Sequence, residues 1–169
     1  MLDIAGVNAL SPDDFVARFG DVAEHSPWVA ETAARERPFA SREAMIEAFA
    51  AAVAGASHEA RLALIRAHPD LAGKAARAGT MAEDSRREQA GVGLDSLTEV
   101  EYARFTDLNT RYRDKFGFPF IFAVKGATKG MILDAFEARS ADDVETEFAT
   151  ALAQVARIFR FRLEDRIAS

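Results

Sequence analysis

The chain has 169 residues, 49% of them apolar, and a formal net charge of −6. This size fits one domain with a real core, so we expect residues 1–169 to form a single domain, and the negative charge argues against a nucleic-acid or anionic-membrane binder. Cysteine is absent, which excludes disulfides, thiolate metal sites and cysteine nucleophiles. No signal peptide and no apolar run near the roughly 20 residues of a membrane-spanning helix is visible, so we expect a cytoplasmic protein.

Helix start and stop signals recur along the chain and predict an all-α fold. Serine or threonine stands before most apolar segments, where its side chain can accept a hydrogen bond from a backbone N–H. Two of these residues, Thr80 and Thr98, have a glutamate three residues later, which is the spacing of a capping box. The expected caps are Ser11, Ser26, Ser41, Ser57, Thr80, Thr98, Thr128 and Ser140. We predict a bundle of about eight helices, over residues 12–19, 27–36, 42–54, 58–67, 81–90, 99–115, 129–138 and 141–166.

One apolar segment, residues 118–124, does not fit the helical pattern. Pro119 and the lack of a partner strand favour an extended buried loop over a strand. Its backbone N–H and C=O groups need partners, and a planar ligand could supply them. The alternative is that the segment is plain core.

Among the three histidines, His68 is the best candidate for chemistry. It follows the predicted helix 58–67, and Pro69 biases its backbone out of the α region, so that its ring can point away from the helix axis. The alternative is a C-terminal histidine that the helix dipole favours.

Two further groups of polar residues could contact a ligand. Ser85, Glu88 and Gln89 share one face of a helix and could bind a ligand rich in N–H and C=O groups, although a solvated polar face has the same pattern. Near the C-terminus, Arg162 could bind a carboxylate through two hydrogen bonds, or could pair with an acidic side chain.

Several kinds of site are not predicted. The chain has no glycine-rich phosphate loop, no dinucleotide fingerprint and no nucleophile elbow. No two histidines have the spacing of a metal site. We therefore expect neither a metal ion nor a cofactor.

The sequence resembles the OHCU decarboxylase family of uric acid degradation, whose substrate is 2-oxo-4-hydroxy-4-carboxy-5-ureidoimidazoline. The resemblance covers nearly the whole chain and depends on two blocks in order, His-Pro-Asp-Leu-Ala from residue 68 and Phe-Gly-Phe-Pro-Phe from residue 116. A third stretch, residues 24–31, supports it. From Arg139 to Asp143 the chain departs from the Arg-Leu-x-Asn pattern that we expect, which puts only a turn in doubt.

The resemblance implies an all-helical carboxy-lyase that forms (S)-allantoin without a metal or a cofactor. By match, His68 is the proton donor, and we expect Glu88 to act with it in catalysis. The implied substrate-binding residues are Pro69, Ser85, Arg86, Arg87, Gln89, Phe120, Ile121, Phe122, Ala123, Val124 and Arg162. We expect His68, the 85–89 face and the 118–124 loop to line one small-molecule pocket, with Arg162 at or near its rim.

The resemblance also implies partners and leaves alternatives. We expect a homodimer, to which the aromatic-rich last helix could contribute, and a separate urate oxidase and hydroxyisourate hydrolase upstream. The main alternative is a related enzyme that acts on another ureido or purine-derived ring. A second alternative is a helical binding domain without catalytic activity.

Overall fold

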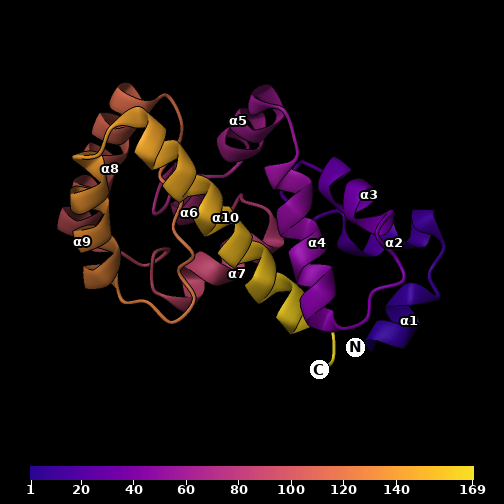
Figure 1. Ribbon diagram of the computed structural model, residues 1–169. Helices are drawn as coiled ribbons and strands as arrows, with labels where there is room; N and C mark the ends of the chain where they lie inside the picture. The colour runs from indigo at the N-terminus through magenta and orange to yellow at the C-terminus, as the bar shows by residue number, and fades with distance from the viewer. The chain divides into compact units, whose positions relative to one another are not determined.

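Ten α-helices and no β-strand make up the computed structural model, which describes residues 1–169 (Figure 1). The all-α class predicted from the sequence is confirmed, with ten helices in place of about eight. The helices are α1 Ile4–Asn8, α2 Pro12–Phe19, α3 Trp28–Ala34, α4 Arg42–Ala54, α5 His58–Arg66, α6 Lys74–Ala78, α7 Glu83–Gly91, α8 Glu99–Phe116, α9 Lys129–Ser140 and α10 Val144–Arg166. None of them combines the length and the apolar character that crossing a lipid bilayer requires.

Contacts within the chain divide it into two compact units. The first unit consists of Met1–Ala67 and Ala156–Ser169, and the second unit consists of His68–Val155. Helix α10 is continuous and contributes its N-terminal part to the second unit and its C-terminal part to the first.

Most of the predicted caps are confirmed. Five side-chain oxygens accept a hydrogen bond from a backbone N–H in the first turn of their helix, and they belong to Ser11, Ser41, Ser57, Thr98 and Thr128. At α8 the Glu101 carboxylate also accepts from the Thr98 N–H, which completes the predicted capping box. These bonds satisfy N–H groups that have no partner within the helix.

Three predicted caps are wrong, because the hydroxyl forms its hydrogen bond elsewhere or because the helix begins at a different residue from the one predicted. The Ser26 hydroxyl donates to the Glu24 carbonyl, and α3 starts without a side-chain cap. Helix α7 starts after Ala82, three residues beyond Thr80. Ser140 is the last residue of α9, and Asp143 caps α10 by accepting the Thr146 N–H.

The two helices missing from the prediction, α1 and α6, have five residues each. A five-residue helix spans fewer than two turns and therefore shows no apolar period in the sequence. Helix α1 is capped by Asp3, whose carboxylate accepts the Gly6 N–H at 2.8 Å.

The core of the first unit is an aromatic cluster from α2, α4 and α10. Phe15 packs on Phe19 with ring centroids 5.1 Å apart, and Phe49 meets Phe159 edge-on at 6.3 Å. All four rings are fully or almost fully buried. The two chain ends meet in this unit, where the Ala168 N–H donates to the Leu2 carbonyl at 2.8 Å.

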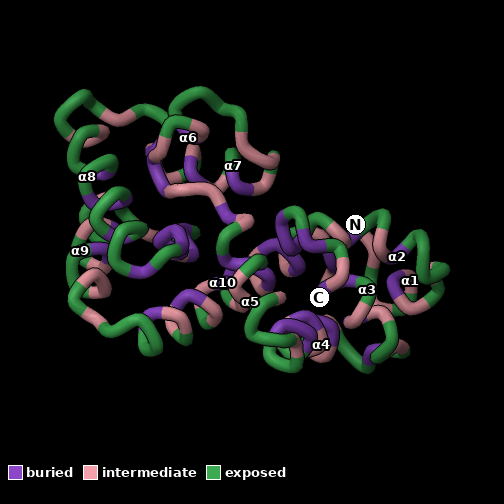
Figure 2. Tube along the Cα trace, turned by 90° about the horizontal axis from the view of Figure 1, so that it is seen from above, coloured by how far each residue is buried: buried purple, intermediate pink, exposed green.

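The core of the second unit forms around α8, α9 and the 118–124 loop. The ring of Phe120 stacks on Phe136 with centroids 3.9 Å apart, and Tyr112 meets Phe120 edge-on at 5.4 Å. Helices α8 and α9 pack against each other. Along the long helices, buried residues recur every three or four positions among exposed ones, as expected for helices with one face toward a core. Figure 2 colours the chain by this burial.

Candidate active site

His68 is the first residue of the second unit and is buried, with 5% of its surface exposed. Helix α5 ends at Arg66, with Ala67 as its C-cap, as the proline at position 69 predicts. The histidine therefore lies between a helix end and an irregular turn, and its position depends on what fixes that turn.

Side chains from two helices fix the turn Asp70–Ala72, which we call the 70–72 turn. From α7, the Gln89 side chain accepts the Ala72 N–H at 2.8 Å and donates to the Asp70 carbonyl at 3.2 Å. From α8, Asn109 donates to the Leu71 carbonyl at 2.9 Å. Ala72 has a φ of 53°, a left-handed conformation that an alanine adopts only where its surroundings stabilise it.

The same turn is also bound through its acidic side chain. Arg113 Nε donates to Asp70 Oδ1 at 2.8 Å, from a position one turn beyond Asn109 on α8. The residues that follow His68 are thus held by both backbone and side-chain contacts. Sequence reasoning missed Asn109 and Arg113 in this role, since nothing near them in the chain marks them.

Helix α7 carries the predicted polar face. Ser85 and Gln89 are buried and Glu88 is half-buried, whereas Arg86 and Arg87 are exposed. Arg87 forms an ion pair with Asp84 on its own helix. The structure thus separates the inward residues of the 85–89 segment from its two arginines. The Gln89 amide, which we expected to face a ligand, has its donor and its acceptor engaged by the 70–72 turn.

The 118–124 loop is buried, as predicted, except for Phe122, which is half-buried, and it leaves α8 through Gly117, whose φ is 76°. Two of its backbone groups bind side chains from other helices. The Ile121 carbonyl accepts from Arg139 Nη1 at 2.6 Å, and the Ala123 N–H donates to Gln154 Oε1 at 2.9 Å. The prediction that a ligand could satisfy the backbone of this loop therefore applies to fewer groups than expected.

A buried charge cluster holds Arg139 in place. Glu147 is 0% exposed, and its Oε1 accepts from Arg139 Nε at 2.7 Å and from the Tyr112 hydroxyl. Burial, and after it the Glu147 carboxylate, raises the pKa of the Tyr112 hydroxyl far above its usual range. None of these three residues is among the site residues predicted from the sequence.

Arg162 lies in the first unit and is 3% exposed. Its guanidinium donates to the Val22 carbonyl at 3.0 Å and to Glu24 Oε1 at 2.9 Å. The structure thus contains the carboxylate partner that the sequence analysis left open as an alternative. Its predicted contact with a ligand stays a prediction.

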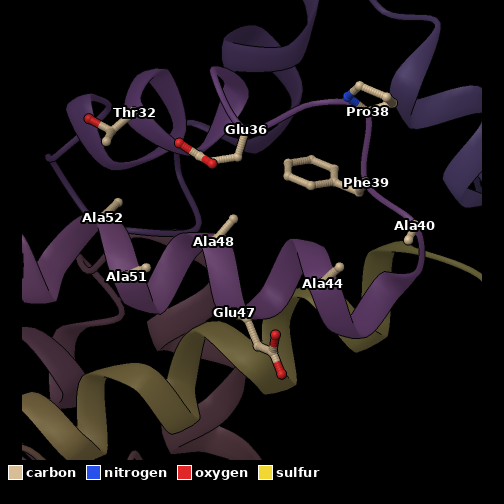
Figure 3. A pocket seen from close by; sticks show the side chains of 10 residues that line it. All are labelled: Thr32, Glu36, Pro38, Phe39, Ala40, Ala44, Glu47, Ala48, Ala51 and Ala52. Atoms are coloured by element: carbon tan, nitrogen blue, oxygen red, sulfur yellow. The ribbon is translucent and has the colours of Figure 1, made fainter.

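Each unit has a surface hollow. In the second unit a hollow of about 410 Å³ is bordered by Pro69, Asp70, the start of α6 and one side of α8. In the first unit a hollow of about 510 Å³ lies between α3 and α4, where the methyl groups of Ala48 and Ala52 point toward it and Phe39 lines it (Figure 3). The hollow between α3 and α4 is lined by no predicted site residue, so it is not a candidate active site. No group of three His, Cys, Asp or Glu side chains is arranged to hold a metal ion.

Comparison with known proteins gives consistent matches. A family model described as OHCU decarboxylase matches residues 8–164. The chain is 45% identical over 168 residues to the 2-oxo-4-hydroxy-4-carboxy-5-ureidoimidazoline decarboxylase of Haloferax volcanii. The aligned region covers 99% of this chain and 98% of that protein. It is 42% identical to the uric acid degradation bifunctional protein PucL of Bacillus subtilis over 99% of this chain and 33% of that protein.

A solved structure also matches this chain in fold. The fold is similar to the crystal structure of (S)-allantoin synthase, with a TM-score of 0.81 and 31% sequence identity. This match covers 100% of the present chain and 55% of the other, so the present chain spans about half of that longer chain.

The buried phenol generates a prediction about alkaline pH. Because the folded state raises the pKa of Tyr112, its stabilising contribution is complete below about pH 10, the ordinary tyrosine pKa, and is lost as pH rises above that value. The free energy of unfolding of the wild type should therefore fall more steeply above pH 10 than that of Tyr112→Phe, by up to about 1.4 kcal/mol per pH unit. Denaturant titrations from pH 8 to 11 would measure both slopes. Parallel curves for the two proteins would contradict the assignment.

Proposed function

Because this chain belongs to the OHCU decarboxylase family, we propose that it removes CO₂ from 2-oxo-4-hydroxy-4-carboxy-5-ureidoimidazoline and forms (S)-allantoin. The observation that carries the proposal is the family match from residue 8 to residue 164, a span that contains His68, the 85–89 segment and the 118–124 loop. The Bacillus relative, which is named for uric acid degradation, supports a place in urate breakdown.

The chemistry of this reaction needs no external electron sink. Loss of CO₂ leaves an electron pair on a ring carbon, and the adjacent ring carbonyl or imine can delocalise it. Oriented hydrogen-bond donors in a site that excludes water then stabilise the developing charge. We accordingly propose a reaction that is independent of metals and cofactors.

His68 is the proposed acid that protonates the neighbouring, ureido-bearing ring carbon after this delocalisation, while the 4-hydroxyl loses its proton and becomes a ring carbonyl of allantoin. The new C–H bond must form on one face to give a single enantiomer, so one fixed acid has to deliver the proton. Imidazole suits this role because its ordinary pKa of about 6.5 lies near working pH. The burial of His68 and the many contacts to the 70–72 turn support a fixed ring position.

The remaining predicted residues take different roles. Glu88, half-buried on α7, is proposed to orient the ureido N–H groups or the hydroxyl proton of the substrate. Ser85 and the 118–124 loop are proposed to bind the substrate, and Gln89 to act through the 70–72 turn. From the resemblance we further propose one domain, a homodimer, a cytoplasmic location, and a separate urate oxidase and hydroxyisourate hydrolase that supply the substrate.

Stereochemistry provides the main test of the reaction. Freshly generated substrate should lose CO₂ faster with the protein than without it, and circular dichroism should show an excess of (S)-allantoin over the racemic product of spontaneous decay. No acceleration and no optical activity would reject the enzyme. Turnover of a different ureido ring, but not of this one, would support the related-enzyme alternative.

Metal removal tests the proposed electron sink within the substrate. After exhaustive chelation and dialysis, the turnover rate should be unchanged, because delocalisation into the ring replaces a Lewis acid. The measurement is initial rate with and without added divalent metal. Loss of activity that one equivalent of metal restores would contradict this account.

His68→Asn should fold normally and lose decarboxylation by about 10²- to 10⁴-fold, the usual contribution of a positioned acid. Glu88→Gln should also be severely impaired, because it removes the charge at nearly constant shape. The matched control is His58→Asn, the same change at the exposed first residue of α5, which should keep the wild-type rate. Near-wild-type turnover by folded His68→Asn would refute the assignment.

A further inference from the structure

The buried loop between α8 and α9 has two edges that differ in hydrogen bonding. On one edge, the Ile121 carbonyl accepts from Arg139 and the Ala123 N–H donates to Gln154. In an extended chain the N–H and C=O of one residue point in the same direction, and those of the next residue point in the opposite direction. Phe122 therefore presents its N–H and C=O on the other edge.

The ring positions support an extended conformation in this part of the loop. The side chains of Phe120 and Phe122 lie on the same side, with ring centroids 6.2 Å apart and planes within 14°, as expected for residues i and i+2 of an extended chain. The backbone N–H and C=O of Phe122 form no hydrogen bond within the chain. Phe122 is the one half-buried residue of this otherwise buried loop, so its unpaired N–H and C=O lie where a partner from outside the chain can reach them.

We infer that Arg139 and Gln154 are positioning residues, and that they orient the loop so that the backbone N–H and C=O of Phe122 bind the ureido or ring amide of the substrate. An amide or urea group offers an acceptor next to a donor, which complements this pair. The inference rests on the proposed function, because it assigns a role to the same substrate-binding loop.

Arg139 is itself fixed by its surroundings. Its Nε donates to the fully buried Glu147, to which the Tyr112 hydroxyl also donates. Its guanidinium carbon lies 4.3 Å from the centre of the Phe120 ring. The group that binds the Ile121 carbonyl is therefore held by an ion pair and by a ring in the same loop.

Gln154 is the informative position for a test. Replacing Arg139 would leave the buried Glu147 carboxylate without its cation and could unfold the protein. Gln154 is half-buried on α10, and its side-chain oxygen accepts one hydrogen bond, from the Ala123 N–H. Gln154→Leu removes that acceptor, whereas Gln154→Glu keeps an oxygen at the same place.

Steady-state kinetics would compare these variants with Ala153→Leu, which places a leucine at the exposed neighbouring position of α10. Gln154→Leu should raise KM by up to roughly tenfold, the effect of one neutral hydrogen bond, with kcat within about threefold. Gln154→Glu and Ala153→Leu should keep the wild-type KM. A folded Gln154→Leu variant with the wild-type KM would overturn the inference, as would equal impairment of the Glu and Leu variants.

Backbone NMR provides a readout that does not depend on turnover. Addition of (S)-allantoin should shift and protect the Phe122 amide, while the Ala123 amide is already protected by Gln154 in the absence of ligand. A ligand response at Ala123 and none at Phe122 would overturn the assignment of the edges. If the wild type has no decarboxylase activity, the proposed function fails. If the wild type is active but these two measurements fail, only the present inference is wrong.

Discussion

Buried backbone that is neither helix nor sheet imposes the main constraint on this protein. Helices satisfy their own N–H and C=O groups, but the 70–72 turn and the 118–124 loop cannot, and both contain buried residues. Side chains from the surrounding helices provide the partners. Gln89 and Asn109 bind the turn, and Arg139 and Gln154 bind the loop.

This solution requires charged groups inside the protein. A buried ion pair is expensive to desolvate, and its formation contributes little net stability compared with apolar packing. Glu147 nevertheless lies at 0% exposure, with one carboxylate oxygen bound by Arg139 and Tyr112. Its structural value is geometric, because it fixes the guanidinium that binds the loop carbonyl. In the first unit, Arg162 and Glu24 form a second pair of this kind, with both side chains 3% exposed.

The proposed reaction depends on the same two segments, the 70–72 turn and the 118–124 loop. His68 directly precedes the 70–72 turn, and the 118–124 loop carries the proposed substrate contacts. Stereospecific protonation requires an acid and a substrate that keep one relative orientation, and preorganised groups stabilise developing charge without having to move during the reaction. Side chains from the surrounding helices supply the hydrogen bonds that fix these two irregular segments.

The sequence by itself determined the features that depend on neighbouring residues. The bounds of α2 and α4 agree with the predicted 12–19 and 42–54, because caps and apolar spacing act over three or four residues. The interruption at Pro119 likewise marks the loop. Only the tertiary structure decided the roles of Gln89, Asn109, Arg139 and Gln154. Their hydrogen bonds join residues 17 to 38 positions apart, and such pairs depend on helix packing and side-chain rotamers that no local pattern encodes.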